Sequence, residues 1–177
     1  MRGLRRPLAV VIGLILMLGV VLPVVATPAA EHGDLAQGKG VAWSAGRYMF
    51  IANGQQVMFI YEAWKDADGA VFGNYYYWQQ SINLTVWGPV TCINVVGNHA
   101  WMAGNVEGVS GNPDFADLVG TESWWQVFDN TYYGMPDVST GLGAAAAPAG
   151  TDWCNDMPDP RFPWDLMNGN LVVRDHQ

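Results

Sequence analysis

The chain has 177 residues, of which 50% are hydrophobic and 14% are charged. This composition excludes an intrinsically disordered protein, because disorder requires low hydrophobicity and high net charge. After residue 26, five Lys and Arg residues stand against sixteen Asp and Glu residues, which gives a net charge of −11. A body this acidic lacks the clustered cations that bind nucleic acid or anionic lipids, and its length suits one domain.

The first 26 residues have the pattern of a secretory signal peptide. Three arginines precede an uncharged apolar run over residues 8–26, and the run ends in small residues, which predicts cleavage after Ala26 and a secreted protein. The alternative is an uncleaved leader, the one expected route to a membrane, because a run of nineteen residues lies near the lower limit for spanning a bilayer. Residues 27–40 are small and polar and predict a flexible tether, so a single β domain is expected over residues 41–177.

Short hydrophobic runs dominate the chain after the tether. They are rich in Val, Ile, Tyr, Phe and Trp and are separated by Gly, Asn or Asp, the pattern of an antiparallel sandwich or barrel. The expected strands span residues 47–52, 56–64, 70–79, 82–87, 90–96, 100–106 and 123–128, with 171–174 as a closing strand. We therefore predict an all-β fold, either an antiparallel β-sandwich or a small β-barrel of about seven to eight strands.

The residues between these runs predict turns, one short helix and a long loop. Gly97 and Asn98 tolerate positive φ and suit a tight hairpin. Asn112 and Pro113 predict the cap and the first turn of a helix of about two turns. Residues 131–168 show no sustained hydrophobic period, so we expect a long loop rich in Gly, Ala, Pro and Asp.

The chain has two cysteines, Cys92 and Cys154. In an exported chain an even cysteine count is typical of a disulfide, so we predict that the two are joined. Cys92 lies on the expected strand 90–96, on the opposite side from Ile93 and Val95. We therefore expect the bridge to hold the long loop across one face of the sheet.

Aromatic residues are unusually frequent, with nine Trp, seven Tyr and six Phe, all after residue 26. Neighbours on a strand point to opposite faces, so residues 75–78 and 124–125 place rings on both faces of the sheet. One interpretation is that the rings fill the core of a small domain, and the other is that exposed rings stack on sugars or apolar ligands. The candidates for ligand stacking are Tyr76, Trp78, Trp124 and Trp125.

Carboxylates are the abundant reactive groups. Asp66 and Asp68 in a turn, and Asp152 and Asp156 in the long loop, are weak candidates for a calcium site, because hard cations take oxygen ligands. Hairpin geometry fully explains the first pair and is the favoured interpretation. Two carboxylates are also the requirement of a glycosidase. The candidates for that catalytic pair are Asp114, Asp117, Asp129 and Asp152.

Other reactive residues favour structural roles. Residues 42–46, AWSAG, are a loose relative of the serine nucleophile elbow, but the alternating strands and helices that such an elbow requires are missing. Ser44 is therefore expected to be an ordinary strand residue. His99 follows Asn98 at a turn, where an exposed side chain is expected, and the sequence predicts no cofactor and no metal site built on His or Cys.

In residues 88–100, GPVTCINVVGNHA, a predicted strand with G, V, T and C turns at GN into a second strand. This hairpin resembles that of an uncharacterised family of bacterial secreted all-β proteins. Residues 127–130 (VFDN) and 169–173 (GNLVV) resemble two later strands of the family. In the family, Gly and an acidic residue usually follow the DN pair, whereas Thr131 and Tyr132 follow it here. The resemblance implies a secreted all-β domain and carries over no catalytic residue.

The sequence as a whole favours a secreted binding or structural module over an enzyme. A glycan or another cell-surface component is the kind of partner that exposed rings would suit. The alternative is a secreted carbohydrate-active hydrolase that uses a pair of the aspartates named above.

Overall fold

The computed structural model describes residues 42–144, 152–159 and 163–175. Over these residues the chain forms a closed antiparallel β-barrel of eight strands, which confirms the all-β prediction and selects the barrel over the sandwich. The predicted signal peptide (1–26) and tether (27–40) lie outside the described residues. In the described part, no helix is long and apolar enough to cross a membrane.

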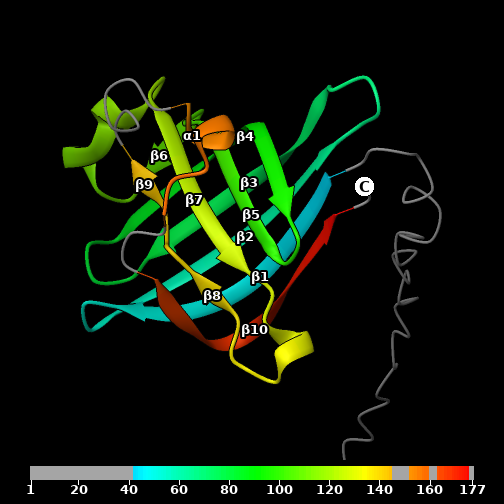
Figure 1. Ribbon diagram of the computed structural model, residues 1–177. Coiled ribbons are helices and arrows are strands. Elements are labelled where there is room, and N and C mark those ends of the chain that lie inside the picture. The colour runs from blue at the N-terminus through cyan, green and yellow to red at the C-terminus, as the bar shows by residue number, and fades with distance from the viewer. Residues whose placement is uncertain (1–41, 145–151, 160–162, 176–177) are drawn as a thin grey trace, which may run out of the picture. The chain divides into compact units, whose positions relative to one another are not determined.

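The strands follow one another around the barrel in nearly sequential order. Each of β1, β2, β3, β4, β5, β7, β8 and β10 pairs with the next, and β10 pairs back with β1 to close the ring (Figure 1). The short strands β6 and β9 add to β4 and β7. The elements are β1 (Ala42–Ala52), β2 (Gln55–Lys65), β3 (Val71–Gln79), β4 (Leu84–Val96), β5 (His99–Asn105), β6 (Gly108–Ser110), η2 (Pro113–Leu118), β7 (Glu122–Phe128), η3 (Thr131–Tyr133), β8 (Val138–Ser139), β9 (Gly143–Ala144), α1 (Trp153–Asp156) and β10 (Trp164–Asp175).

The tight hairpin and the short helix form as predicted. The β4–β5 turn consists of Gly97 and Asn98, and Gly97 has a φ of 60°, a value that favours glycine. The helix, η2, is a 3₁₀ helix, and the Asn112 side chain caps it by accepting a hydrogen bond from Asp114 N at 3.1 Å. Local sequence therefore determines both features.

β4 is one strand where the sequence predicts two, because its first half pairs with β3 and its second half with β5. Its register shifts between Val90 and Cys92, which marks a β-bulge. Before the bulge, Leu84 begins an alternation in which even-numbered residues face the interior; after it, the odd-numbered Ile93 and Val95 face the interior. The extra residue thus reverses the alternation and turns Cys92 outward, as predicted.

The prediction of a long loop over residues 131–168 is wrong in part. This stretch contains η3, β8, β9 and α1, and β10 begins at Trp164 rather than at Leu171. Most side chains in the first half of β10 are exposed, and β8 has two residues. Such strands lack the alternation of hydrophobic and polar residues by which a strand is detected in sequence.

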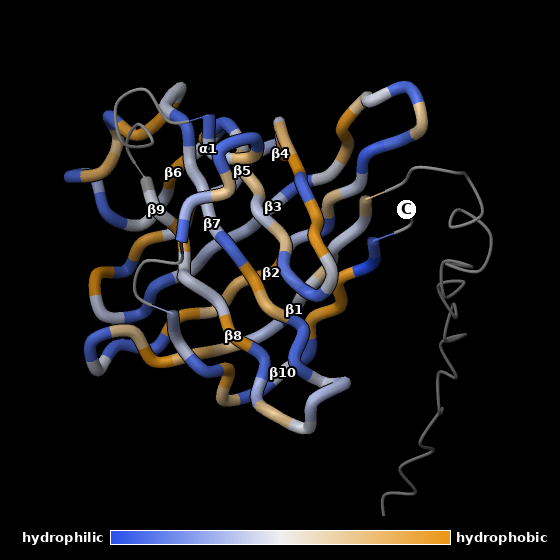
Figure 2. Tube along the Cα trace, viewed as in Figure 1, coloured by the Kyte–Doolittle hydropathy of each residue, from blue (hydrophilic) through white to orange (hydrophobic). Residues whose placement is uncertain are grey.

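Aromatic rings fill the barrel. Trp125 has no exposed surface, and its ring centroid lies 5.4 Å from that of Phe59, 5.9 Å from that of Tyr61 and 5.2 Å from that of Tyr75. Tilted and edge-on contacts of this kind are those that aromatic pairs prefer. Hydrophobic and hydrophilic positions are interleaved along the strands (Figure 2), as expected where one face points inward. The interpretation that rings fill the core is therefore confirmed for the inward-facing rings.

A short segment that we call the strap (residues 152–159) covers the outer face of the barrel over β4, β5 and β7. Cys92 of β4 and Cys154 of α1 form the predicted disulfide. Trp153 packs on Trp124 with the ring centroids 4.1 Å apart, and its Nε1 donates to a backbone carbonyl of β7 at 3.2 Å. The bridge thus holds part of the long loop against one face of the sheet, as predicted.

Candidate functional site

One end of the barrel carries a cavity of about 240 Å³, which we call the barrel-mouth pocket. It lies at the end where the β1–β2 and β3–β4 turns are found. Its walls come from β1 and the turn after it, from the end of β3, from the stretch after β8 and from the start of β10, so the folded barrel is needed to bring them together. The lining residues are Phe50, Ala52, Asn53, Gln55, Tyr77, Gln79, Thr140, Gly141, Leu142 and Trp164.

The barrel side of this pocket is aromatic. Phe50 is fully buried and Tyr77 is 8% exposed, so both rings separate the pocket from the barrel interior. Trp164, which is half-buried, adds a third ring from the start of β10. A Cβ atom at Gly141 would lie 3.2 Å from the Phe50 ring, so the glycine lets the chain after β8 approach closely. Phe50 and Tyr77 are themselves almost wholly covered, so Trp164 is the ring of the lining with most surface open to a bound molecule.

Two hydrogen bonds run in sequence along the pocket wall. Tyr77 Oη donates to Gln79 Oε1 at 3.0 Å, and Gln79 Nε2 donates to Gln55 Oε1. They link the end of β3 to the start of β2, and these strands are neighbours in the barrel. Burial raises the pKa of Tyr77 to about 12, so its hydroxyl remains a donor at neutral pH. With the Gln79 amide oxygen facing Tyr77, its Nε2 faces Gln55, and Gln55 Oε1 is the last acceptor of the series.

No Asp, Glu, Lys, Arg or His is among the lining residues. The polar side chains are the amides of Asn53, Gln55 and Gln79 and the hydroxyl of Thr140. The Thr140 hydroxyl is engaged, because it accepts from a backbone N–H of β7 at 3.0 Å and donates to the next backbone carbonyl at 3.2 Å. The pocket therefore suits an uncharged ligand, since an ion placed there without a partner would lose its hydration.

The predicted ligand-stacking aromatics lie elsewhere in the fold. Trp125 is fully buried in the barrel core, so its ring is not available to a ligand. Trp124 lies under the strap against Trp153. Tyr76, which is 38% exposed, and Trp78, which is half-buried, lie on the outer side of β3. None of the four candidates lines the pocket.

The carboxylates predicted as calcium ligands hold local turns. Asp66 Oδ1 accepts the backbone N–H of Asp68 at 3.0 Å and a second N–H of the same turn at 2.8 Å. Asp152 caps α1, and Asp156 Oδ2 accepts the Asp152 N–H at 2.8 Å. Over the described ranges, no three His, Cys, Asp or Glu side chains come together as metal ligands. These hydrogen bonds account for the carboxylates of Asp66, Asp152 and Asp156, and Asp68 takes part in its turn through its backbone N–H.

The aspartates predicted for a hydrolase come from separate elements. Asp114 and Asp117 are exposed on η2, Asp152 is exposed in the strap, and Asp129 follows β7. The carboxylate that lies near Asp129 is Asp137, for which the sequence carries no motif. None of the five lines the barrel-mouth pocket.

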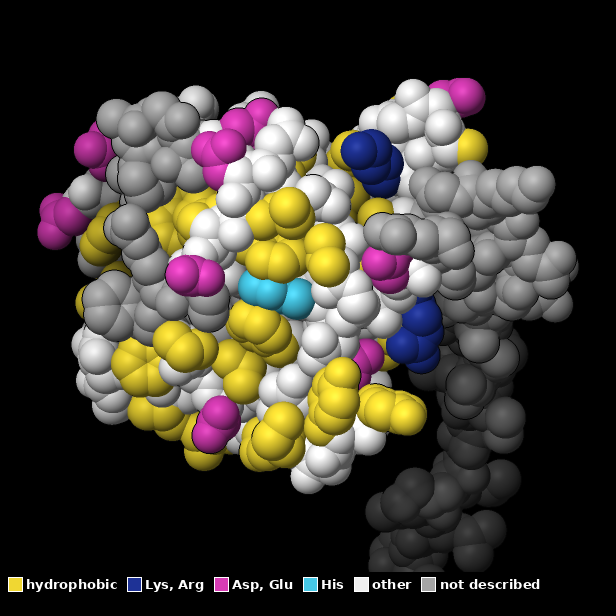
Figure 3. Space-filling model, in the orientation of Figure 1, with side chains coloured by type: hydrophobic (Ala, Val, Ile, Leu, Met, Phe, Trp, Pro, Cys, Tyr) yellow, Lys and Arg dark blue, Asp and Glu magenta, His cyan; other side chains and the backbone are white. Residues whose placement is uncertain are grey.

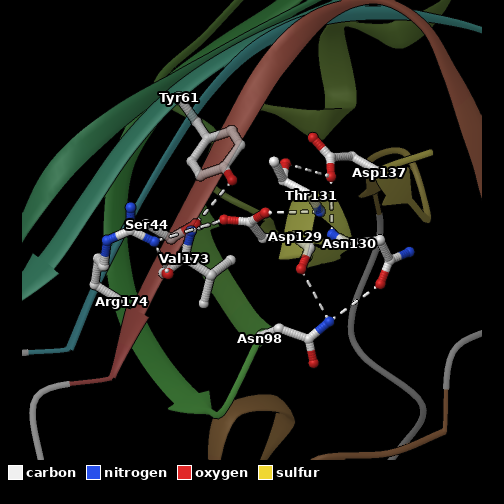
Figure 4. A network of polar contacts seen from close by, with 9 residues as sticks. All are labelled: Ser44, Tyr61, Asn98, Asp129, Asn130, Thr131, Asp137, Val173 and Arg174. Atoms are coloured by element: carbon white, nitrogen blue, oxygen red, sulfur yellow. Dashed lines mark hydrogen bonds and ion pairs between the residues drawn. The ribbon is translucent and has the colours of Figure 1, made fainter. Parts of the chain in front are cut away.

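Asp129 and Asp137 belong to a polar cluster beside β10 (Figure 4). β8 pairs with β10 over two residues, so N–H groups farther along that edge of β10 need other acceptors. Asp129 Oδ2 accepts the Val173 N–H at 3.2 Å, and the Leu171 N–H donates to Asp137. The two carboxylates thus accept the β10 N–H groups that β8, a strand of two residues, does not reach.

Ser44 lies in the same cluster and is fully buried. Its Oγ is 2.8 Å from Tyr61 Oη, a hydrogen bond that joins β1 to β2. Burial raises the pKa of Tyr61, and the nearby Asp129 and Asp137 carboxylates raise it further. The pair satisfies two buried hydroxyls, and Ser44 is the ordinary strand residue that was expected.

His99 is half-buried, although its place next to a turn predicts an exposed side chain. Because the turn has two residues, His99 is the first residue of β5 and lies opposite Phe128 of β7. Its ring lies between Trp101 and Phe128, with centroid distances of 3.4 Å and 3.7 Å. In Figure 3 the histidine side chain is flanked by hydrophobic side chains. Its Nε2 is 3.1 Å from Gln126 Oε1. Burial lowers the pKa of His99 to about 4, so the ring is neutral at pH 7.

Acidification is expected to destabilise the protein through His99. The pKa of this ring is about 4 in the folded chain against 6.5 in an unfolded one, so the unfolded chain binds protons more tightly between these values. Its contribution to stability should be intact above about pH 6.5 and decrease as the pH falls towards about 4. His99→Gln should remove this part of the pH dependence and leave that of the carboxylates. Urea unfolding of both proteins across this range measures the difference, and equal slopes would contradict the prediction.

The pocket residues were not predicted, because each lies at a strand end and no motif joins them. One signal was present: two adjacent glutamines, Gln55 and Gln56, lie after the expected strand 47–52, and another adjacent pair, Gln79 and Gln80, lies where the expected strand 70–79 ends. Neighbouring antiparallel strands place such positions at the same end of a sheet. Amides at one end of the barrel were therefore open to prediction, but the rings beside them were not.

Comparison with known proteins gives no relative for this chain. It matches no protein-family model, no curated protein and no solved structure. Its function therefore has to be inferred from the geometry and chemistry of the barrel itself.

Proposed function

We propose that the protein is a secreted, non-catalytic binding module that holds one small uncharged ligand in the barrel-mouth pocket. The observation that carries this proposal is the lining of the pocket, in which rings and amides surround about 240 Å³ and no charged side chain takes part. Ligand sites are typically concave, with a small number of placed polar groups that orient the ligand. The proposal requires no cofactor.

The lining supports binding rather than catalysis. Acid–base and nucleophilic catalysis need a titratable or activated group within reach of the ligand. The hydroxyls among the lining residues are those of Tyr77, whose pKa is raised to about 12, and Thr140, which is engaged with the backbone. The hydrolase alternative gains no support, because none of its candidate aspartates lines the pocket.

We propose that the protein is exported. Two observations support this: residues 1–26 have the pattern of a leader, and the chain has a disulfide, a bond that persists in oxidising compartments. A glycan or another cell-surface component is then the available partner. Protein purified from culture medium should begin at or near Thr27, as N-terminal sequencing can establish. Membrane-bound protein that begins at Met1 would favour an uncleaved anchor instead.

Trp164→Ala is expected to weaken ligand binding by roughly tenfold or more, because it removes one ring of the pocket. Saturation-transfer NMR with uncharged sugars, cyclic alcohols and small amides measures binding to the full protein. The matched control is Trp78→Ala, which removes a half-buried tryptophan from the outer side of β3. Equal losses in both variants would place binding outside the pocket, and a panel in which nothing binds would overturn the proposal.

A further inference from the structure

We infer that the ligand of the barrel-mouth pocket is a single neutral sugar residue at the end of a glycan. This inference rests on the proposed function, since it names the class of ligand that the same pocket takes. It is carried by the direction of the hydrogen bonds in the wall, by the combination of rings and amides, by the size of the cavity and by its lack of charge.

The hydrogen bonds leave donors free at the pocket. Gln79 Oε1 accepts from Tyr77, and Gln55 Oε1 accepts from Gln79. Gln55 therefore presents its Nε2 hydrogens, and no group in the described part of the chain accepts from them. Water can accept from these hydrogens, and a ligand that displaces this water keeps their hydrogen bonds only if it supplies an acceptor oxygen. The hydroxyl and ring oxygens of a sugar are such acceptors.

The lining matches the two surfaces of a sugar ring. The C–H bonds of the ring form an apolar face, and its hydroxyls project around the edge. Trp164 offers aromatic surface to the face, with a small exposed part of Tyr77 beside it, while Asn53 and Gln55 offer amides to the edge. An aliphatic chain would displace water from the half-buried Gln55 donors without replacing its hydrogen bonds, which is unfavourable.

The size of the cavity limits the ligand to one residue. A volume of about 240 Å³ is below the roughly 300–1,000 Å³ of sites for drug-sized molecules. The interior behind it is filled, since Phe50 and Phe59 have no exposed surface and Tyr48 is 1% exposed. A glycan cannot pass through the barrel, so its terminal residue enters the pocket.

Acidic sugars do not fit this site. Their carboxylates are recognised by Arg, Lys or backbone N–H clusters, and no Arg, Lys or His lines the pocket. The chain as a whole carries a net charge of −8, which repels anions further. The structure therefore points to neutral sugars.

The test is a set of saturation-transfer NMR titrations of the full protein with glucose, galactose, N-acetylglucosamine and their methyl glycosides. Glucuronate and cyclohexanol are the charged and the non-sugar comparators. The matched variants are Gln55→Leu and Gln56→Leu, because Gln56 is the adjacent residue and donates instead to Met49 Sδ, outside the pocket. At least one neutral sugar should bind, with affinity reduced about tenfold or more in Q55L and unchanged in Q56L.

Other results separate the failure of this inference from the failure of the proposed function. Binding of cyclohexanol without any neutral sugar would overturn the sugar assignment and leave a small-molecule binding module. Glucuronate that binds as tightly as glucose would overturn the neutral class. Equal affinities in Q55L and Q56L would place the sugar elsewhere, and no binding at all would remove both proposals. Should Q55L lose its folded NMR spectrum, Gln79→Leu supplies the same test from the neighbouring strand.

Discussion

Replacing Trp125 by alanine is expected to lower the free energy of unfolding by about 3–5 kcal/mol. The ring has no exposed surface and contacts three other rings inside the barrel. Removal leaves a cavity that β-strands fixed in a closed ring cannot collapse to fill, so the loss should fall at the upper end for a core residue. Urea unfolding followed by circular dichroism measures the change.

The control for this substitution is Tyr132→Ala. Tyr132 is 91% exposed in η3, and a surface substitution of this kind typically changes stability by less than about 0.5 kcal/mol. If both variants lost the same stability, the aromatic core would not be what stabilises the barrel. A Trp125→Phe variant should lie between them, because it keeps part of the ring packing.

Replacing Cys92 and Cys154 together by alanine is expected to cost roughly 4 kcal/mol, the second large effect. The disulfide links residues 62 apart in sequence, and in the chain-entropy model closing a ring of this size restricts the unfolded chain by that amount. Denaturant unfolding of the variant and of the oxidised protein gives the difference. Trp153, which is 2% exposed, should also become accessible to a fluorescence quencher in the variant.

Two measurements check the origin of this effect. Reducing agent should lower the stability of the natural protein towards that of the double variant and leave the variant unchanged. Thiol titration of the denatured but unreduced protein should find no free cysteine. Two free thiols per chain would contradict the bridge and the stability difference assigned to it.

Much of the fold was open to prediction because its signals are local. The turn at Gly97 and the cap at Asn112 need only neighbouring residues, and both form as expected. The bulge in β4 and the early start of β10 depend instead on pairing between distant strands. Pairing between distant strands overrides the local pattern at such places. In β4, for example, the sequence predicts a break between two strands, but one strand continues.

The candidate site was less predictable than the fold. Trp125 and Tyr76 each lie beside other aromatic residues in the sequence, yet the Trp125 ring is buried and the Tyr76 ring is exposed. The His99 side chain was expected to be exposed because a turn precedes it, but its ring packs between Trp101 of β5 and Phe128 of β7. Which ring faces a ligand depends on strand register and on the strap, and neither is encoded in a short motif.

Pairing between β1 and β10 also determines when the domain can fold. β1 has its two neighbours only when residues 164–175 have been made, because β10 covers the edge that β2 leaves free. Until then the growing chain presents an unpaired strand edge, which is a site for aggregation with other chains. Contacts between the ends of a domain also slow folding, because a long loop must close first. The barrel is therefore expected to form late and cooperatively rather than strand by strand during synthesis.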